Sequence, residues 1–132
     1  MKISYHRVSV EDISRKLREI LSGMAEVKIA VLFGSVLRRN VVRDLDVGIV
    51  TEPELDLKEL IRISNAIEDE LGIPVDLVPL RRAPPKLRLK ALSSGRRLVV
   101  RDQKLYALLL SEALSETVDV DLKLKYMHVK SQ

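Results

Sequence analysis

The sequence predicts a single α+β domain in which helices flank a small mixed β-sheet. Three apolar runs have the length of strands, at Val27–Phe33, Leu45–Val50 and Ile73–Leu80. Segments with apolar residues at helical spacing lie before, between and after these runs. The near-continuous apolar character of Val27–Phe33 is typical of a strand that is covered on both faces.

The connection between the first two strands indicates the kind of sheet. Only Gly34–Arg43 joins them, which is shorter than the roughly dozen residues that a parallel crossover needs. We therefore expect these two strands to be antiparallel or non-neighbouring. This connection argues against a Rossmann sheet.

The first two helices are predicted from their end signals. Ser9 and Asp12 form a capping box for a helix that Gly23 ends. The segment Thr51–Glu54 predicts the start of a second helix, which Gly72 ends. The expected inward face of this second helix consists of Leu57, Leu60, Ile61, Ser64, Ile67 and Leu71.

Three more elements are expected before the C-terminal tail. A basic helix is predicted over Lys86–Ser94, a short edge strand over Arg97–Val100, and a long helix from Asp102 to about Thr117. At the other end of the chain, Met1–Arg7 is expected to be a short extended lead. The single domain 1–132 is thus divided into a core of about 10–114 and a tail of 118–132.

The tail alternates apolar and charged residues from Val118 to Val129. A period of two favours a strand, although it does not exclude a helix. Such a strand could pair with an edge strand of a second subunit, which would make a homodimer. The tail also contains Asp119-Val120-Asp121, with no Gly-Ser pair ahead of it, and we interpret this segment as a solvent-facing surface.

The composition limits the classes of function. The chain has no cysteine, which excludes a disulfide framework and a thiolate zinc site. No apolar run approaches the ~20 residues needed to cross a bilayer, and Met1–Ser4 does not open a signal peptide, so we expect a cytoplasmic protein. Asparagine and glutamine are scarce beside abundant charged residues, which favours a thermophilic source.

The charge is moderately basic, with a net charge of +4 and a pI near 9.5. Basic residues gather at Arg38–Arg43, at Arg81 and Arg82, and from Lys86 to Arg101, where they could attract phosphate or form a solvated face. One Phe, three Tyr and no Trp leave few rings for stacking on single-stranded nucleic acid. Nucleic-acid binding is therefore the weaker interpretation of the charge.

Two aspartates stand at the start of the second predicted strand. Because side chains alternate along a strand, Asp44 and Asp46 point to one face while Leu45 and Val47 point into the core. Two carboxylates on one face make a cation site. Magnesium suits it, because this ion takes one or two carboxylates and fills its other positions with water and phosphate oxygens.

Gly34 and Ser35 follow the first predicted strand and supply the other half of the site. Gly34 allows the backbone to approach a ligand closely, Ser35 can cap a helix that begins there, and the free N–H groups of a helix N-terminus attract phosphate. Each feature alone is more often an ordinary turn or a solvated loop. Their order along the chain favours a bound nucleoside triphosphate.

Asp76 is a third carboxylate, alone among the apolar residues of the third predicted strand. An aspartate in a buried strand is costly unless it is paired or binds a metal ion. We therefore expect Asp76 to join the metal site, with a salt bridge to an arginine as the alternative.

These residues resemble the signature of the DNA polymerase β nucleotidyltransferase superfamily, and the short chain resembles its minimal nucleotidyltransferase (MNT) branch. The resemblance rests on Gly34-Ser35, then Arg38, then Asp44-Leu45-Asp46, and it covers roughly Val10–Leu114. The chain departs from the pattern at Arg43, where the family usually has a small or hydroxyl residue. It also has Arg39 where a glycine often follows the loop arginine.

The resemblance implies the nucleotidyltransferase fold and a two-magnesium reaction. Asp44 and Asp46 would bridge the two ions. Asp76 would complete the ion nearer the acceptor and help to deprotonate or position the acceptor hydroxyl.

The same resemblance implies that Gly34 and Ser35 hold the terminal phosphates while Arg38, with Arg39, neutralises charge. It also implies a HEPN toxin as partner, which such proteins neutralise by binding it or by adenylylating a tyrosine. We therefore expect transfer of a nucleotide, AMP from ATP, to a partner protein. A module that neutralises its partner by contact alone is the alternative, and transfer to a small molecule is a minor one.

Overall fold

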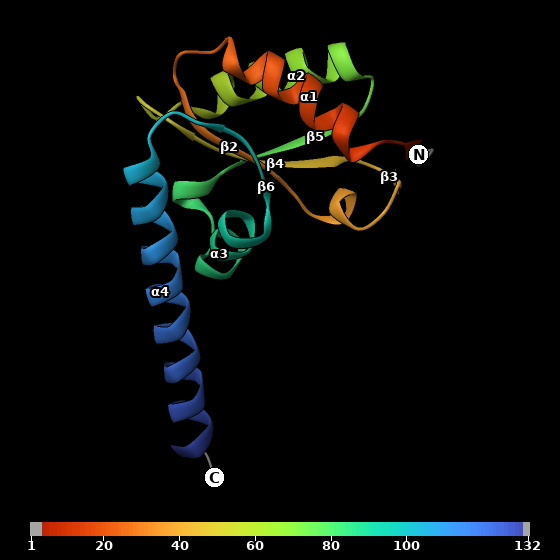
Figure 1. Cartoon of the computed structure of the whole chain (residues 1–132). Helices are drawn as coiled ribbons and strands as arrows, with labels where there is room; N and C mark the ends of the chain where they lie inside the picture. Colours follow the sequence, from red (N-terminus) through yellow and green to blue (C-terminus); the bar gives the residue numbers. More distant parts are fainter. Residues whose placement is uncertain (1–3, 131–132) are drawn as a thin grey trace.

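The computed structural model describes residues 4–130 of the chain. The elements (Figure 1) follow one another as β1 (His6–Arg7), α1 (Val10–Ser22), β2 (Val27–Phe33), η1 (Ser35–Leu37), β3 (Val41–Val42), β4 (Leu45–Thr51), α2 (Leu57–Leu71), β5 (Val75–Pro79), η2 (Leu80–Arg82), α3 (Pro85–Ser94), β6 (Arg96–Val100) and α4 (Gln103–Lys130). The predicted extended lead is confirmed at β1, whereas its first three residues and the last two of the tail lie outside the described residues. Within residues 4–130, no helix combines the length and the apolar character needed to cross a membrane.

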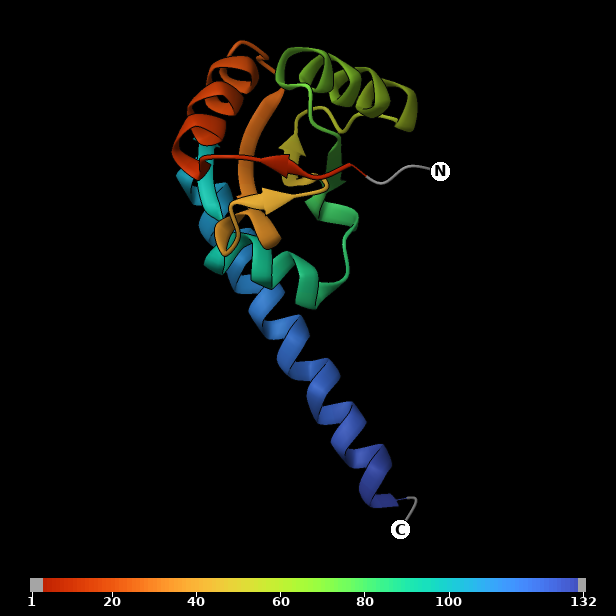
Figure 2. The same ribbon diagram turned by 90° about the vertical axis from the view of Figure 1, so that its right-hand side faces the viewer.

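The main sheet has four strands in the order β5-β4-β2-β6. β2 is antiparallel to both β4 and β6, whereas β5 is parallel to β4. This arrangement confirms the mixed sheet and the position of β6 at an edge. Of the two alternatives that the short Gly34–Arg43 connection left open, antiparallel or non-neighbouring strands, the structure shows antiparallel pairing. A separate two-stranded sheet joins β1 to β3 (Figure 2).

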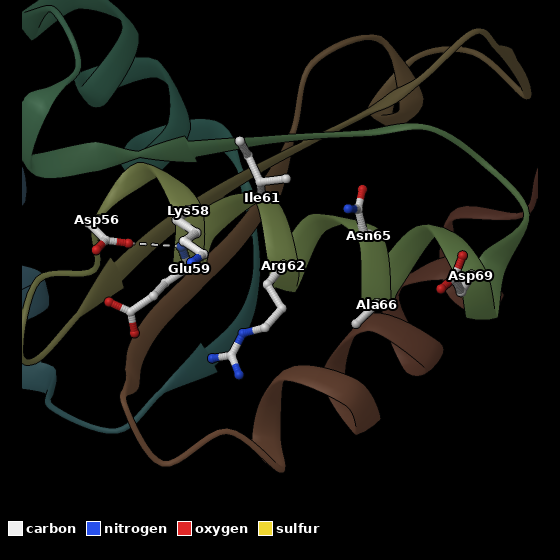
Figure 3. A pocket seen from close by; sticks show the side chains of 8 residues that line it. All are labelled: Asp56, Lys58, Glu59, Ile61, Arg62, Asn65, Ala66 and Asp69. Carbon is white, nitrogen blue, oxygen red and sulfur yellow. Dashed lines mark hydrogen bonds between the residues drawn. The ribbon is translucent and has the colours of Figure 1, made fainter.

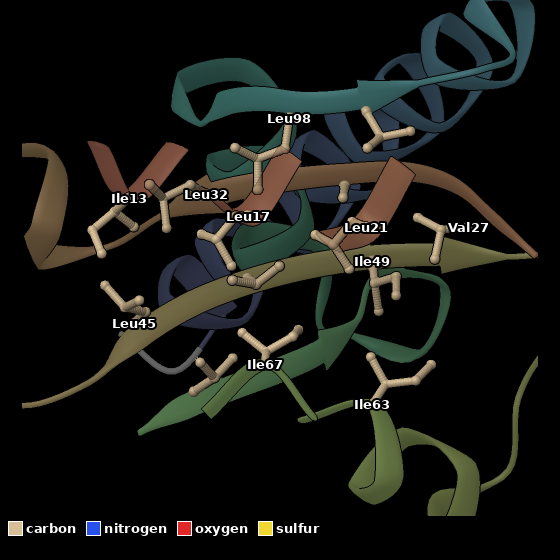
Figure 4. Close-up of a cluster of buried hydrophobic side chains, with 14 of the residues drawn as sticks. Ile13, Leu17, Leu21, Val27, Leu32, Leu45, Ile49, Ile63, Ile67 and Leu98 are labelled. Carbon is tan, nitrogen blue, oxygen red and sulfur yellow. The ribbon is translucent and has the colours of Figure 1, made fainter. Parts of the chain in front are cut away.

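Helices cover both faces of the main sheet, with α1 and α2 on one face and α3 and α4 on the other (Figure 1). Ala30 and Leu32 of β2 belong to the hydrophobic cluster under α1 and α2, while Val31 and Phe33 belong to the cluster under α3 and α4. Figure 4 shows the first cluster, in which α1 contributes side chains such as the fully buried Leu17. The strand is therefore covered on both faces, as its apolar sequence predicts.

The second helix begins later than the sequence predicts. Thr51 is the last residue of β4, and its Oγ1 accepts a hydrogen bond from the N–H of Leu55 at 3.3 Å. Asp56 is the N-cap of α2, since its Oδ1 accepts a hydrogen bond from the N–H of Glu59 at 2.9 Å. The predicted start was wrong because pairing with Val27 extends β4 as far as Thr51.

The buried face of α2 also differs from the predicted one. Leu60, Ile63 and Ile67 are buried, whereas Leu57 and Ile61 are 70% and 50% exposed. Residues four apart share a helix face, so Leu57 and Ile61 form one exposed aliphatic ridge. The helical period alone could not distinguish this face from the buried one, because both carry large aliphatic residues.

The tail is helical, and the strand predicted over Val118–Val129 was wrong. α4 runs without a break to Lys130, and its second half projects from the domain (Figure 1), with Leu122 and Leu124 still 59% and 57% exposed. A helix that is packed in its first half gains one hydrogen bond for each residue added, whereas a strand would need a sheet edge to pair with. Because this segment is helical, it cannot form a dimer by pairing as a terminal strand, and the homodimer itself stays a prediction.

Most basic residues between Lys86 and Arg101 hold the fold together. Arg88 is only 8% exposed, and its guanidinium donates hydrogen bonds to the carbonyl oxygens of Leu80 and Ala83 and pairs with Glu116 of α4. Three further arginines make contacts within the fold. Arg96 pairs with Glu11, Arg97 stacks over the ring of Tyr106, and Arg101 donates a hydrogen bond to the carbonyl oxygen of Val27. These side chains are therefore not a free phosphate-binding surface.

Candidate active site

Asp46 and Asp76 lie side by side on neighbouring strands. The parallel pairing of β4 with β5 sets Asp46 opposite Asp76. Leu45 and Val47 belong to the cluster under α1 and α2, so the alternation of side chains turns Asp46 toward the face that carries α3. Asp44 lies just ahead of β4, two residues before Asp46. The structure thus brings the three predicted carboxylates to one end of two adjacent strands.

The exposure of Asp76 differs from the prediction. β5 is an edge strand, and Asp76 is exposed, as is Asp44, whereas Asp46 is half-buried. The inference that burial forces Asp76 into a metal site was therefore wrong. Among the described residues, no salt bridge joins Asp76 to an arginine. Its register opposite Asp46 is what supports a place in the site.

Gly34 lies directly against the carboxylate of Asp46. Phe33, the last residue of β2, pairs with Asp46, and Gly34 then turns with a φ of 86°. A Cβ atom on Gly34 would stand 2.1 Å from Oδ2 of Asp46. Glycine is therefore required here twice, by the left-handed backbone and by the closeness of the carboxylate.

Ser35 lies inside a single 3₁₀ turn, so its predicted role as a helix cap was wrong. Gly34 is the N-cap of η1, and no side chain caps this turn. The carbonyl oxygen of Ser35 accepts hydrogen bonds from the N–H groups of Arg38 and Arg39, at 3.0 and 2.9 Å. One such turn does not form the helix N-terminus that the sequence predicted as a phosphate site. Ser35 itself is half-exposed beside the carboxylates.

The electrostatics of Asp46 reflect its burial and, after that, its acidic neighbours. Burial raises the pKa of the Asp46 carboxyl above its ordinary value, and the charges of Asp44 and Asp76 raise this pKa further. Lys90 of α3 acts in the opposite direction and lowers it. The charges of Asp44 and Asp76 therefore disfavour the ionised Asp46 carboxylate, and Lys90 offsets part of their effect.

A hollow of about 190 Å³ lies on the Gly34 side of the carboxylates. Its lining consists of Phe33, Gly34, Leu37, Arg38, Lys90 and Ser94. Of the predicted residues, Gly34 and Arg38 line this hollow, whereas Ser35 and Arg39 do not. Two cations on its wall make it suitable for phosphate.

Sequence reasoning missed Lys90 and Ser94. Both lie on α3, whose orientation over Gly34 is a tertiary property. The basic character of the Lys86–Ser94 segment was a signal for this region, but it could not separate Lys90 from Lys86 one turn earlier.

The sequence also missed the contact of β1 with β3, where the N–H of Val8 donates to the carbonyl oxygen of Asn40 at 2.8 Å (Figure 2). This contact holds the loop that joins Gly34 to Asp44.

The donor set fits magnesium by its chemistry. Asp44, Asp46 and Asp76 offer carboxylate oxygens, which are the ligands that Mg²⁺ prefers. Within residues 4–130, no three His, Cys, Asp or Glu side chains are gathered closely enough to hold a metal ion as they stand. After burial, the charges of Asp44 and Asp76 also raise the pKa of Asp46, and a bound cation would offset this unfavourable effect on the Asp46 carboxylate.

A larger hollow, of about 840 Å³, lies elsewhere, along the outer side of α2 (Figure 3). Its lining residues all come from α2 and its N-cap: Asp56, Lys58, Glu59, Ile61, Arg62, Asn65, Ala66 and Asp69. A surface provided by one helix cannot enclose a ligand, and none of the three aspartates of the site borders it. We therefore place the site at the carboxylates rather than at this larger hollow.

Comparison with solved structures shows the same fold elsewhere. A chain of the toxin–antitoxin complex MntA–HepT matches with a TM-score of 0.72 at 19% identity, over 92% of this chain and 97% of the other. A chain from the tri-AMPylated Shewanella oneidensis HEPN toxin in complex with MNT antitoxin gives the same values. A toxin–antitoxin structure with AMP-PNP matches with a TM-score of 0.73 at 21% identity, over 89% and 97%.

Comparison of sequences identifies the family. No curated protein sequence matched the chain. Residues 15–104, however, match the family described as Polymerase beta, Nucleotidyltransferase. This match spans most of the chain and includes Gly34 and all three aspartates of the site. The chain therefore belongs to the polymerase beta nucleotidyltransferase family.

Proposed function

We propose that this protein is a magnesium-dependent enzyme that transfers AMP from ATP to a hydroxyl group of a HEPN-type partner protein. The observation that carries the proposal is the pairing of Asp46 with Asp76, beside Gly34 and the hollow lined by Arg38 and Lys90. A pure binding module has no physical need for carboxylates that repel one another at a strand end.

The proposed reaction exchanges one phosphorus–oxygen bond for another. The acceptor oxygen attacks the α-phosphorus of ATP, the bond from that phosphorus to the β-phosphate oxygen breaks, and pyrophosphate leaves. Asp76 is exposed and can take the acceptor proton and pass it to water. Arg38 and Lys90 face the developing negative charge of the leaving phosphates.

Asp44, Asp46 and Asp76 are the residues that would hold magnesium. The bound ions would neutralise charge on the attacking and leaving oxygens. Gly34 keeps the Asp46 carboxylate close to the phosphate hollow, because any side chain at this position would push that carboxylate away.

The neighbouring structures support the choice of nucleotide and partner. One of them contains AMP-PNP, and another contains an AMPylated HEPN toxin with its MNT antitoxin. The motif of this chain resembles that same branch. ATP and a HEPN protein are therefore the first donor and acceptor to test.

The test combines the protein with magnesium, α-labelled ATP and the purified HEPN protein from the same organism. We expect the label on the HEPN protein, with a mass increment of AMP, and its loss in Asp46→Asn and on chelation of magnesium. Asp119→Asn is a matched control, because Asp119 lies in an exposed Asp-x-Asp segment of α4. Neutralisation of the toxin without any label would favour the contact-only module instead.

A further inference from the structure

The second half of α4 carries a row of exposed aliphatic side chains. In Figure 1 and in Figure 2 this half of the helix extends away from the rest of the domain. At about 100° per residue, four of its aliphatic side chains fall within a quarter of the helix circumference: Leu114, Val118, Leu122 and Val129. They are between 48% and 69% exposed, and we define these four residues as the α4 stripe. A continuous row of this kind is typical of an interaction surface, whereas single exposed aliphatic residues are not.

The α4 stripe is not the side of the helix that packs on the domain. The buried residues of α4 are centred about 140° around the helix from it: Tyr106, Leu109, Ala113 and Thr117. Two of them, Tyr106 and Leu109, belong to the hydrophobic cluster that α4 forms with α3 and β2. A second molecule can therefore cover the stripe without displacing α3.

Two charged residues indicate what covers the stripe. Lys125 stands in line with the stripe, and Asp121 lies one turn earlier on the same flank. Among the residues that the structure describes, no ion pair engages Lys125. Asp121 accepts from Lys86 at 3.1 Å through Oδ1 and is still 50% exposed, so its second carboxylate oxygen can accept from another cation. The stripe thus offers both a base and an acid to the molecule that packs on it.

A second copy of the same helix, in antiparallel orientation, fits this arrangement. If Leu122 faces Leu122 of the other copy, each residue before position 122 meets a residue about equally far after it. Leu114 then meets Val129 of the other copy. Lys125 of one copy lies over Val118 of the other, so that its aliphatic part covers the valine and its ammonium group reaches Asp121. Because the pair is symmetric, each contact occurs twice and two ion pairs form.

Other arrangements place like charges together. In a parallel pair each residue meets its own counterpart, so Lys125 would face Lys125, which is unfavourable. Val120 and Leu124 are also exposed, but they continue the side of α4 that packs on α3. An antiparallel contact through that side would bring the two copies of Lys123 together. The charges therefore favour the stripe and the antiparallel order.

We propose that the α4 stripe binds a second copy of this chain, through two antiparallel helices with Leu122 at the symmetry axis. The contact uses none of the residues of the candidate active site, so it is independent of the proposed nucleotidyl transfer. Asp119 lies about 100° around the helix from Val118 and stays outside the contact. The homodimer that the sequence predicted through a terminal strand thus forms through a helix instead.

The first experiment measures the mass of the purified chain by sedimentation equilibrium. We expect twice the single-chain mass of 15.0 kDa, and the single-chain mass in Leu122→Glu. Leu124→Glu is the matched control and should keep the dimer, because Leu124 is 57% exposed on the same helix but lies on the side of Val120. Glutamate is a good helix former, so both variants should fold, and thermal melting checks this. A single-chain mass of the unmodified protein up to about 0.5 mM, or an equal loss of dimer in the control, would overturn the proposal.

The second experiment tests the orientation by disulfide formation. The chain has no cysteine, so a single introduced cysteine can pair only with its own copy in another chain. In the antiparallel pair Leu122→Cys brings two thiols together, whereas the two copies of Leu114→Cys are about 24 Å apart along the helix axis. We therefore expect a cross-linked dimer from Leu122→Cys and none from Leu114→Cys. Equal cross-linking of both variants would overturn the antiparallel order.

A HEPN protein is the other candidate to cover the stripe. In that case the chain alone has the single-chain mass, and Leu122→Glu weakens binding of the purified HEPN protein while Leu124→Glu does not. This result would overturn the proposed pairing and assign the stripe to the HEPN protein. Loss of the dimer in Leu122→Glu with unchanged HEPN binding supports the second copy.

Discussion

The Cβ position of Gly34 and the Oδ2 atom of Asp46 are 2.1 Å apart, so the backbone of the Gly-Ser turn and the half-buried carboxylate occupy adjoining space. No other residue type fits at position 34 without moving Asp46. The turn after β2 therefore limits where the Asp46 carboxylate on β4 can lie, so the Gly-Ser turn and the carboxylates of the candidate site are in direct contact.

Gly34→Ala is expected to impair both stability and turnover. The backbone at φ 86° and ψ −155° is essentially restricted to glycine and costs about 1–3 kcal/mol with a Cβ, and displacement of Asp46 should lower turnover at least tenfold. Denaturation and the labelling assay measure the two effects. Gly72→Ala is the matched control, because Gly72 has a φ of 70° but nothing within 4 Å of its Cβ position. The control should lose stability and keep turnover, and an equal loss of turnover would show that the Asp46 contact is irrelevant.

Asp46→Asn is expected to stabilise the metal-free protein at neutral pH. The folded-state pKa of Asp46 is raised above its ordinary value of 3.8. The protonated Asp46 carboxyl therefore stabilises the folded protein fully below pH 3.8, and this contribution is lost as the pH rises through the higher pKa of the folded state. Asparagine does not ionise, so it avoids the repulsion from Asp44 and Asp76.

Melting in EDTA at neutral pH and near pH 4 checks this expectation. The variant should melt above the unmodified protein at neutral pH, and the difference should shrink in acid. Asp119→Asn should show no comparable difference. A variant that melts lower at neutral pH would mean that the Asp46 carboxylate is stabilised by contacts other than those described.

Lys90→Met is expected to weaken ATP binding without loss of stability. Lys90 is exposed on α3 and lines the phosphate hollow, so its removal should raise the Kd for magnesium–ATP about tenfold, the scale of one charge-assisted hydrogen bond. Lys86→Met is the matched control one helical turn earlier, where the lysine pairs with Asp121 at 3.1 Å. Calorimetric titration compares the two. Equal affinities would remove Lys90 from the site.

Arg88→Leu is expected to destabilise the fold by about 3 kcal/mol. It removes a buried guanidinium and, with it, the hydrogen bonds that this group donates to the carbonyl oxygens of Leu80 and Ala83. Urea denaturation measures the loss. Glu116→Gln keeps a hydrogen-bond acceptor for the same guanidinium and should cost much less. If both variants lose the same free energy, the charge pair with Glu116 rather than the carbonyl contacts accounts for the contribution of Arg88 to stability.

Local sequence patterns were sufficient to predict most of the elements. The capping box at Ser9 and the apolar run Val27–Phe33 predicted a helix and a doubly covered strand, and both are present. The length of the connection to β4 excluded a parallel crossover, and the two strands pair antiparallel. These features depend on neighbours along the chain, and so does the spacing of Asp44 and Asp46. The sequence was less able to place the end of β4 and the start of α2, because pairing with Val27 decides them.

The sequence by itself determined that a glycine turn follows one strand and that an Asp-x-Asp pair stands at the start of the next, since strand alternation and chain length are local properties. The tertiary structure decided the rest. The register of β5 sets Asp76 beside Asp46, the orientation of α3 brings Lys90 to the carboxylates, and the lie of α2 exposes Leu57 and Ile61. Each of these depends on which surface packs against which, and residues far apart along the chain determine that together.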